Sequence, residues 1–331
     1  MMIYPVQIPG SVELVSPFEP REILCAFHDI DGTHSLIRDW VPVMTLCIGY
    51  TIRYGLLSAE PEKAVPTVLE HREESFPEAH DFSVESAGLS ALTQMEWAVR
   101  RGIQDGSVDG KGIDPELNGR IIEGILAGRE TFPEIEEDPD AISRIREESS
   151  KLFRIYEKIL LIMSRDRNLA DARIHPEKWI VPGSMEFLRF LRDNGVRNYF
   201  VTGAVVENLP DGRYAGTMFE EVDALGYRFG EGELLSGLEG SAWNRKLPKI
   251  DIMSGLAEKL RISPRNILVV GDGRSEIDAG RAMGGVTISR LPADAIRART
   301  IHRELQTNFI MEQYDLNAIR KLFRKTSDRN P

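Results

Sequence analysis

The chain has 331 residues, of which 42% are hydrophobic and 28% charged, and its formal net charge is −11. This length allows one large domain or two ordinary ones, and the composition is that of a soluble globular protein. The acidic balance excludes the basic surface of a typical nucleic-acid-binding protein, and no apolar run is long enough to span a membrane. We expect no nucleic-acid or membrane partner.

Residues 1–20 are rich in proline and predict a short hairpin or an N-terminal arm over the core. They lack the basic segment and apolar run of a signal peptide, so we expect a cytoplasmic protein. The two cysteines, Cys25 and Cys47, form neither a disulfide framework nor a zinc pattern. Cys25 is expected to be a small core residue in a reducing compartment.

The first strong signal is an apolar run from Ile23 to Phe27, which predicts a buried strand. Asp29 and Asp31 follow it, one residue apart, and a glycine turn comes next. Carboxylates crowded together repel one another and are costly to bury, so such a site needs a cation or a shared proton. Magnesium suits it, because Mg²⁺ prefers oxygen ligands. The alternative is a polar turn at the end of a strand.

From residue 35 to about residue 178 strand signals nearly vanish and helical periods replace them. The segment 60–85 is rich in acid and proline and predicts a loose connector. We interpret 35–178 as a helical domain inserted after the first strand, and 1–34 with 179–331 as the core. The predicted helices of the insertion are 42–56, 92–103, 116–128 and 140–165.

Strands and helices alternate from Val181 onward, which predicts an α/β fold with a parallel sheet and helices on both faces. The segment 204–246 is rich in glycine and is expected to hold a small hairpin. The tail from about 292 is basic and helical, with one short strand near 309–310. The predicted strands are 198–201, 267–270 and 286–289, and the predicted helices begin at 184, 251 and 275.

Polar side chains follow three of these strands. Asp29, Thr202 and Asp272 lie at or just after strand ends, and the carboxyl ends of parallel strands share one edge, where ligands bind. Phosphoryl transfer needs positioned groups and charge stabilisation. Asp29 is a candidate nucleophile, and Asp31 is a candidate general acid and base.

Further residues supply the remaining parts of such a site. Asp29 and Asp272 would hold magnesium, and the Thr202 hydroxyl would contact a phosphate oxygen. Lys246 offers a fixed positive charge to the phosphate and the nucleophile. Glu276, one helical turn after Asp272, would orient Lys246 or a metal-bound water.

The order of these motifs resembles the haloacid dehalogenase superfamily. Two segments, 269–284 and Val181-Pro182-Gly183, are similar to phosphoglycolate-phosphatase-like members. The resemblance covers about 21–34 and 178–290, and it implies a Rossmann-like core with a helical cap inserted after the first motif. The motifs are Asp29-x-Asp31-Gly32-Thr33, Val201-Thr202-Gly203, Lys246 and Gly271-Asp272-Gly273-x-x-Glu276.

The resemblance implies that Asp29 is the nucleophile and that Mg²⁺ is held by Asp29, Asp272 and the backbone carbonyl of Asp31. It implies phosphate contacts from three residues, Thr202, Gly203 and the motif lysine. We favour Lys246 as that lysine over Lys249, because Pro248 and then a helix follow it as in the family. Family members often have Asp where this chain has Glu276.

These observations predict a magnesium-dependent phosphatase that acts on a small phosphorylated metabolite through an aspartyl-phosphate intermediate. Asp31 argues against a dehalogenase, because dehalogenase members lack a second aspartate there. A phosphomutase is the alternative enzyme, since it keeps both aspartates. A non-catalytic binding protein is less favoured because no catalytic residue is missing. The cap selects the substrate in this fold, and the cap sequence matches nothing, so the substrate and the oligomeric state stay open.

Other residues near these motifs have more than one interpretation. His34 lies where the cap begins and is a candidate substrate contact, whereas His28 is expected to pack or to form a hydrogen bond. The cap arginines Arg100, Arg101 and Arg129 are interpreted as solvated helix surface, with an anion site as the alternative.

Residues 105–116 match the spacing of a calcium-binding loop. The apolar residue usual at its eighth position is missing, because Gly112 stands there. We interpret the segment as a polar turn, with calcium binding as the alternative.

Overall fold

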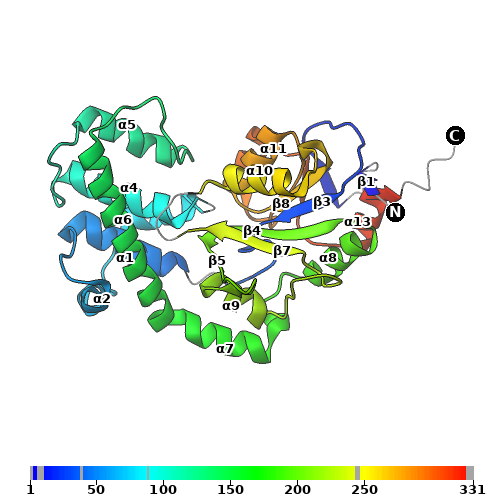
Figure 1. The fold of residues 1–331 in the computed structure, drawn as a ribbon, viewed down its shortest axis with the longest axis horizontal. Helices are drawn as coiled ribbons and strands as arrows, with labels where there is room; N and C mark the ends of the chain where they lie inside the picture. The colour runs from blue at the N-terminus through cyan, green and yellow to red at the C-terminus, as the bar shows by residue number, and fades with distance from the viewer. Residues whose placement is uncertain (1–2, 6–10, 38–39, 88, 243–246, 326–331) are drawn as a thin grey trace. The chain divides into compact units, whose positions relative to one another are not determined.

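The computed structural model describes residues 3–5, 11–37, 40–87, 89–242 and 247–325 (Figure 1). It divides the chain into two compact units. Unit 1 consists of 1–37, 169–241 and 249–331, and unit 2 of 38–168 and 242–248. Unit 2 therefore falls within the predicted insertion except for its second, short segment. Among the described residues, no helix is long and apolar enough to cross a membrane.

Unit 1 is built on a seven-stranded sheet with the order β2-β10-β9-β8-β3-β4-β7. Neighbouring strands are parallel except for β2, which is antiparallel to β10. The predicted α/β fold with a parallel sheet is thus confirmed. The strands are β2 (Val12–Leu14), β3 (Cys25–His28), β4 (Arg197–Val205), β7 (Gly237–Ser241), β8 (Ile267–Gly271), β9 (Val286–Arg290) and β10 (Phe309–Met311).

Helices cover both faces of this sheet (Figure 1). Alternate residues of a strand point to opposite faces. Phe27 therefore packs in the core beneath α10 and α11, whereas Ala26 packs with α8 and α13. The helices of unit 1 are α8 (Ser184–Asp193), α9 (Thr217–Ala224), α10 (Lys249–Leu260), α11 (Arg274–Met283), α12 (Ile296–Glu304) and α13 (Leu316–Leu322).

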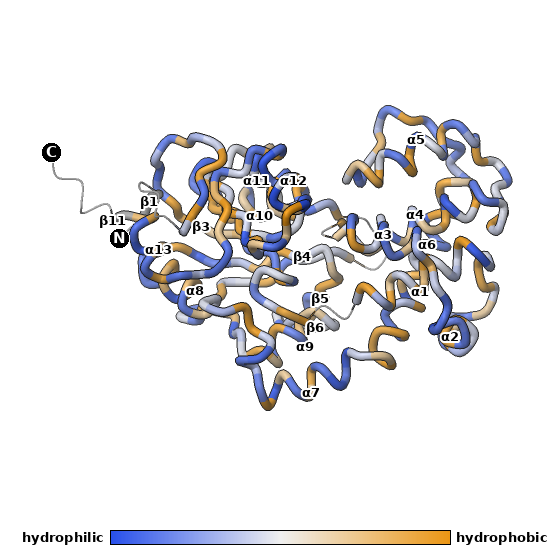
Figure 2. Tube along the Cα trace, turned by 180° about the vertical axis from the view of Figure 1, so that it is seen from behind, coloured by the Kyte–Doolittle hydropathy of each residue, from blue (hydrophilic) through white to orange (hydrophobic). Residues whose placement is uncertain are grey.

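Unit 2 is helical, as the sequence predicted. Figure 2 shows hydrophobic and hydrophilic residues alternating along α6, as expected for an amphipathic helix with one buried face. The helices are α1 (Trp40–Tyr54), α2 (Pro61–Leu69), α3 (Pro77–Glu85), α4 (Ala91–Asp105), α5 (Pro115–Leu126) and α6 (Pro139–Leu160). A π-helical turn, Leu161–Arg165, joins α6 to α7 (Asp166–Ile174), most of which belongs to unit 1. The predicted helix 140–165 is thus helical throughout, but its hydrogen-bonding pattern changes after Leu160 and it continues beyond Arg165.

The prediction of a loose connector over 60–85 was wrong, because α2 and α3 occupy it. Each helix begins with a proline, Pro61 or Pro77, where the missing N–H costs no hydrogen bond. Val68 and Phe82 are buried, so each helix contributes an apolar face to the core of unit 2. Two of the three prolines that indicated a connector therefore mark helix starts, and the third, Pro66, lies inside α2.

Two other segments carry more structure than predicted. The N-terminal arm supplies β2 and also β1 (Ile3–Pro5), which pairs with β11 (Phe323–Lys325). The segment 204–246 holds the predicted small hairpin, β5 (Glu207–Asn208) with β6 (Tyr214–Ala215), but also α9 and β7. The short strand expected near 309–310 is β10.

The chain leaves and re-enters unit 1 through two adjacent segments. The Leu36 amide donates to the Trp179 carbonyl over 2.7 Å, and the Val181 amide donates to the His34 carbonyl over 3.1 Å. Ser35 also forms a bridge with Ile180. Both ends of the insertion are therefore anchored to each other inside unit 1, directly after the first motif.

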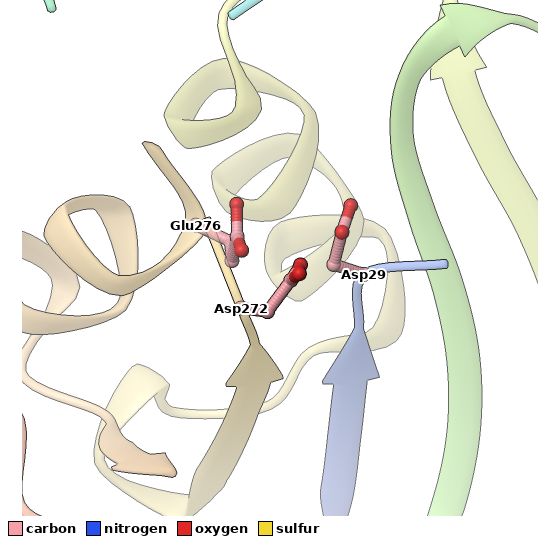
Figure 3. Close-up of side chains that lie close together, drawn as sticks. All are labelled: Asp29, Asp272 and Glu276. Atoms are coloured by element: carbon pink, nitrogen blue, oxygen red, sulfur yellow. The ribbon is translucent and has the colours of Figure 1, made fainter. Parts of the chain in front are cut away.

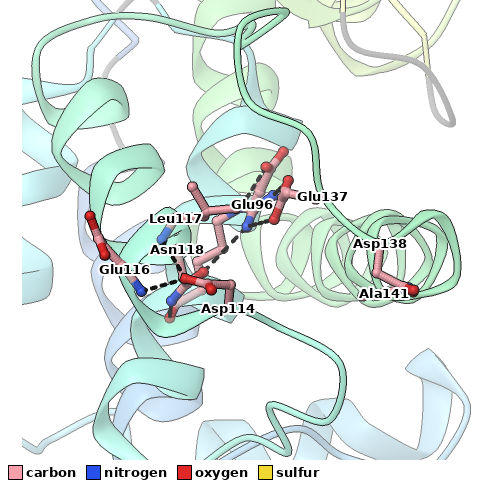
Figure 4. A network of polar contacts seen from close by, with 9 residues as sticks. Glu96, Asp114, Glu116, Leu117, Asn118, Glu137, Asp138 and Ala141 are labelled. Atoms are coloured by element: carbon pink, nitrogen blue, oxygen red, sulfur yellow. Dashed lines mark hydrogen bonds and ion pairs between the residues drawn. The ribbon is translucent and has the colours of Figure 1, made fainter.

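A buried polar network organises unit 2 (Figure 4). Arg100 is 2% exposed, and its guanidinium donates to both carboxylate oxygens of Glu137 over 2.7 and 2.8 Å. It also donates to Glu96 over 2.7 Å and to the Asn118 side-chain oxygen over 3.3 Å. The interpretation of Arg100 as solvated surface was wrong, because α4, α5 and the start of α6 enclose it.

The neighbouring cap arginines have surface partners. Arg101 pairs with Glu78 and Asp105, and Arg129 pairs with Glu134. In the 105–116 segment, Asp114 caps α5 by accepting from the amides of Glu116 and Leu117, at 2.9 and 3.0 Å. The Asp114 carboxylate thus serves as a helix cap, which fits the polar-turn interpretation.

The network predicts a large effect on stability when its cation is removed. Arg100→Met would remove the positive charge that pairs with two largely buried carboxylates and should lower the free energy of unfolding by about 3–5 kcal/mol. Arg101→Met is the matched control, because its partners are more exposed, and it should cost less than about 1 kcal/mol. Urea unfolding of both variants measures the difference, and equal losses would contradict the assignment.

Candidate active site

The turn that follows β3 holds Asp29 and Asp31. The Asp29 amide donates to the Val270 carbonyl of β8 over 2.9 Å, which fixes this residue at the carboxyl edge of the sheet. Gly32 has a φ of +71°, a left-handed conformation that glycine adopts without strain. The amides of the next three residues all approach the Ile30 carbonyl at 2.8–3.2 Å. The backbone of this turn is therefore tightly hydrogen-bonded around two aspartates.

Asp272 and Glu276 come from the neighbouring strand and helix (Figure 3). Asp272 follows β8, and Glu276 is fully buried in the first turn of α11. The Glu276 carboxylate accepts a hydrogen bond from the Gly273 amide and so caps its own helix. A Cβ atom at Gly271 would lie 2.2 Å from the Glu276 side chain, so only glycine fits there.

Lys249 links these carboxylates. It is the first residue of α10 and is 3% exposed. Its Nζ donates to Asp29 Oδ1 over 2.6 Å and to Glu276 Oε2 over 2.8 Å. The sequence favoured Lys246 as the motif lysine, but Lys246 lies outside the described residues. The lysine that the structure brings to Asp29 is Lys249.

The charges of this cluster shift one another. Burial and the neighbouring carboxylates of Glu276, Asp272 and Asp31 raise the pKa of Asp29 well above its usual range, although Lys249 acts against them. Burial acts to raise the pKa of Glu276 as well, but the charge and hydrogen bond of Lys249 outweigh it and lower this pKa. Burial acts to lower the pKa of Lys249, yet Asp29 and Glu276 raise it above the usual value. Lys249 is therefore charged, and Asp29 lacks a full counter-charge.

The carboxylates fit a divalent cation. Ligand atoms of Asp29, Asp272 and Glu276 all lie within 4.8 Å of one another, and hard cations such as Mg²⁺ take carboxylate oxygens. Both carboxylate oxygens of Glu276 are engaged, by Lys249 and by the Gly273 amide, whereas Lys249 contacts only one oxygen of Asp29. Asp29 and Asp272 are therefore the better pair of direct ligands. The Thr33 hydroxyl lies 3.4 Å from Asp272 Oδ1 and helps to orient it. A cation here would also favour the ionised form of Asp29.

Thr202 and Gly203 lie on the other side of β3, in β4. Thr202 is 3% exposed, and its hydroxyl oxygen accepts from the Ala204 amide over 3.1 Å. The pairing of β4 with β7 shifts register between Val201 and Val205, an irregularity that re-aims side chains at a strand end. The hydroxyl proton of Thr202 is not used in this bond and is available to an acceptor.

His34 is placed differently from its predicted role. It is fully buried, its Nδ1 lies 2.6 Å from the Ser184 hydroxyl, and its Nε2 lies 3.1 Å from His28 Nδ1. His28 Nε2 in turn lies 3.2 Å from the Asn198 side-chain oxygen. Both ring nitrogens of His34 are therefore occupied inside the core, which argues against the predicted substrate contact. We reassign His34 to the core that supports the turn.

The direction of this chain follows from Asn198. Its amide group donates to two backbone carbonyls, so its oxygen accepts from His28 Nε2. Neutral His28 then accepts at Nδ1 from His34, and His34 accepts from the Ser184 hydroxyl. Burial lowers the pKa of His28 to about 3 and that of His34 well below its usual value. Both rings are therefore neutral.

Comparison with known proteins identifies the family. A sequence model of the family described as haloacid dehalogenase-like hydrolase matches residues 29–284. The chain belongs to this family. The comparison with curated proteins found no match.

Several solved structures are similar to this haloacid dehalogenase-like hydrolase at low identity. A β-phosphoglucomutase from Clostridium difficile is 10% identical with a TM-score of 0.45, over 89% of this chain and 92% of that one. A predicted phosphoglycolate phosphatase from Haemophilus somnus is 17% identical with a TM-score of 0.43, over 90% and 97%. A phosphonoacetaldehyde hydrolase-like protein from Oleispira antarctica is 15% identical with a TM-score of 0.47, over 95% of both chains. Likeness at this level does not distinguish a phosphatase from a mutase.

Sequence reasoning missed part of the hydrolase site. Lys249 was only the second choice. It follows Pro248 directly and is the first residue of α10, so its backbone is held by the helix. Arg290 was not singled out at all, yet its Nη1 donates to the Gly32 carbonyl over 3.0 Å. A charged residue at the end of the apolar strand 286–289 was the available signal.

The neutral histidines predict acid sensitivity of the hydrolase. The folded-state pKa of His28, about 3, lies below the unfolded value of about 6.5, so the stability it contributes is complete above pH 6.5 and is lost as the pH falls toward 3. His28→Asn should lose less stability between pH 6.5 and 5.5, by up to about 1.4 kcal/mol. Urea unfolding at several pH values measures this slope. Identical slopes below pH 6.5 would contradict it, and equal slopes above pH 7 are the internal control.

Proposed function

We propose that the protein is a magnesium-dependent phosphatase that hydrolyses a small phosphomonoester through an aspartyl-phosphate on Asp29. The observation that carries this proposal is the contact of a buried, charged lysine with the carboxylate of Asp29. Glu276 holds the same lysine from the other side, and Asp272 completes a cluster suited to a cation. A nucleophile, a fixed positive charge and metal ligands thus meet at one edge of the sheet.

The reaction would proceed in two steps. A carboxylate oxygen of Asp29 attacks phosphorus and displaces the ester oxygen, and Asp31 gives that oxygen a proton. Asp31 then removes a proton from a water molecule, which attacks the phosphorus of the aspartyl-phosphate and releases inorganic phosphate. Lys249 would neutralise part of the negative charge that gathers on the phosphoryl oxygens in both steps.

Magnesium, when bound, would supply positive charge to the phosphoryl group and would orient it toward the nucleophile. Asp29 and Asp272 would hold it through their carboxylates, together with the backbone carbonyl of Asp31. Thr202 and Gly203 would contact the phosphate from the β4 side, through the hydroxyl and the backbone amide.

A phosphomutase of the same family is the second candidate. It would also form an aspartyl-phosphate, so the residues on the sheet edge support it equally. It would transfer the phosphoryl group to a sugar phosphate, whereas a phosphatase transfers it to water. A non-catalytic phospholigand-binding protein is the third candidate, and the complete set of acidic and basic groups argues against it.

The proposed mechanism requires the carboxylate of Asp29 as the nucleophile. Asp29→Asn should abolish phosphate release from a panel of phosphorylated metabolites, because an amide cannot form the covalent intermediate. Wild-type release should also disappear in EDTA and return with Mg²⁺. Release that survives in Asp29→Asn would exclude the proposed mechanism. Activity that needs a sugar bisphosphate and yields no inorganic phosphate would establish the mutase instead.

The proposal assigns the catalytic positive charge to Lys249 and not to Lys246. Lys249→Met should lower kcat by about 100-fold or more, since removing one positioned group that stabilises transition-state charge costs about 3–4 kcal/mol. Lys246→Met, the matched control three residues away, should keep kcat within about threefold of the wild type, which is less than 1 kcal/mol. Steady-state kinetics on the best substrate measures both values. The reverse result would restore Lys246 as the motif lysine.

A further inference from the structure

Arg290 is a buried cation that the proposed reaction does not use. It is the last residue of β9, one position beyond Ser289, which pairs with Gly271 of β8. Arg290 is therefore level with Asp272 at the carboxyl edge of the sheet. It is 9% exposed, and in the described part of the chain its Nε has no hydrogen-bond partner.

Arg290 forms a hydrogen bond with the turn after β3, although β8 lies between β9 and β3 in the sheet. Its Nη1 donates over 3.0 Å to the carbonyl of Gly32, which lies in the turn after β3, two strands away from β9. Arg290 is also an electrostatic neighbour of His34 and Tyr314, and Asp29 and Asp272 act on the same tyrosine. The guanidinium thus lies in the buried surroundings of the two aspartates.

Stability alone does not account for this arrangement. A buried guanidinium is costly when no carboxylate pairs with it, and within the described residues Arg290 forms no ion pair. An apolar side chain would fill the same place without that cost. An apolar side chain could not form the hydrogen bond that Arg290 donates to the Gly32 carbonyl. Gly32 directly follows Asp31, so this bond holds the backbone next to the proposed general acid.

We propose that Arg290 is a positioning residue, which fixes the Gly32 carbonyl and thereby sets the direction of the Asp31 carboxylate toward the leaving oxygen. This inference rests on the proposed phosphatase activity. It adds a residue from β9, outside the four motifs, to the parts that control proton transfer.

Leaving-group dependence separates this role from a merely structural one. p-Nitrophenol leaves without a proton, whereas the alcohol of β-glycerophosphate needs one from the general acid. In Arg290→Met, kcat/KM on β-glycerophosphate should fall about 10- to 100-fold, and kcat/KM on p-nitrophenyl phosphate should fall less than about threefold. This ratio reports formation of the aspartyl-phosphate and not its hydrolysis, in which Asp31 acts alike for both esters. Arg290→Lys keeps one donor and the charge, and it should restore most of the loss. Arg303→Met, at an exposed ion pair with Glu13, is the matched control.

A second measurement does not depend on activity. Hydrogen exchange of the peptide that spans 30–35, in the full-length protein with Mg²⁺, should become about tenfold faster or more in Arg290→Met, because the turn loses a charge-assisted hydrogen bond. Exchange should stay near the wild-type rate in Arg290→Lys and Arg303→Met. Unchanged exchange in Arg290→Met, or equal losses of kcat/KM on both esters, would overturn the proposal.

The two measurements also distinguish failure of the inference from failure of the proposed function. If the wild type hydrolyses neither ester, the phosphatase proposal and the catalytic half of this inference fail together. Faster exchange in Arg290→Met would then still support the arginine as the residue that holds the turn.

Discussion

The contact of Lys249 with Asp29 and Glu276 is the interaction on which the site depends. Three carboxylates gather within a few ångströms at the end of a buried sheet, and two of them are buried. Desolvation and mutual repulsion would favour neutral carboxylic acids, which neither attack phosphorus nor bind metal. One buried ammonium keeps Glu276 ionised and shares its charge with Asp29. The remaining negative charge is what makes the cluster suitable for a divalent cation.

The sheet explains why residues so distant in sequence meet. β3 lies between β8 and β4, and all three strands run in the same direction. Their carboxyl ends therefore deliver the Asp29 turn, Asp272 and Thr202 side by side. The two junctions of the insertion are hydrogen-bonded to each other directly after this turn. A large helical segment can thus leave the core here without opening the sheet.

The sequence predicted the parts of the fold that repeat a simple pattern. The parallel sheet, its flanking helices and the helical insertion were predictable, because alternating strands and helices leave few topologies. The prediction failed where the same residue type is compatible with two different local structures. Proline starts α2 as readily as it interrupts a connector, so 60–85 was misjudged. The edge strand β2 is three residues long and gains its order from β10, a partner that no local pattern reveals.

At the site, the types of residue at the strand ends predicted the aspartates, whereas distances along the chain did not identify the lysine or the environment of His34. An Asp-Gly turn alone is common, and the aspartates were recognisable because polar residues recur at the ends of three strands of one parallel sheet. The choice between Lys246 and Lys249 depended on where α10 begins, which is the least certain feature of a sequence-based helix. The burial of His34 was not predictable, because proximity along the chain does not say which way a side chain turns. Its ring points into a core built from α8 and β4.

The glutamate at position 276 shows how a long acidic side chain is accommodated beside a buried lysine. A longer side chain than aspartate can cap the Gly273 amide and still reach Lys249 over 2.8 Å. That reach requires space, and a Cβ atom at Gly271 or Gly273 would lie 2.2 or 2.9 Å from the glutamate. Both positions are glycine. The two glycines and the glutamate therefore form one unit, in which the missing side chains make room for the carboxylate that holds the lysine.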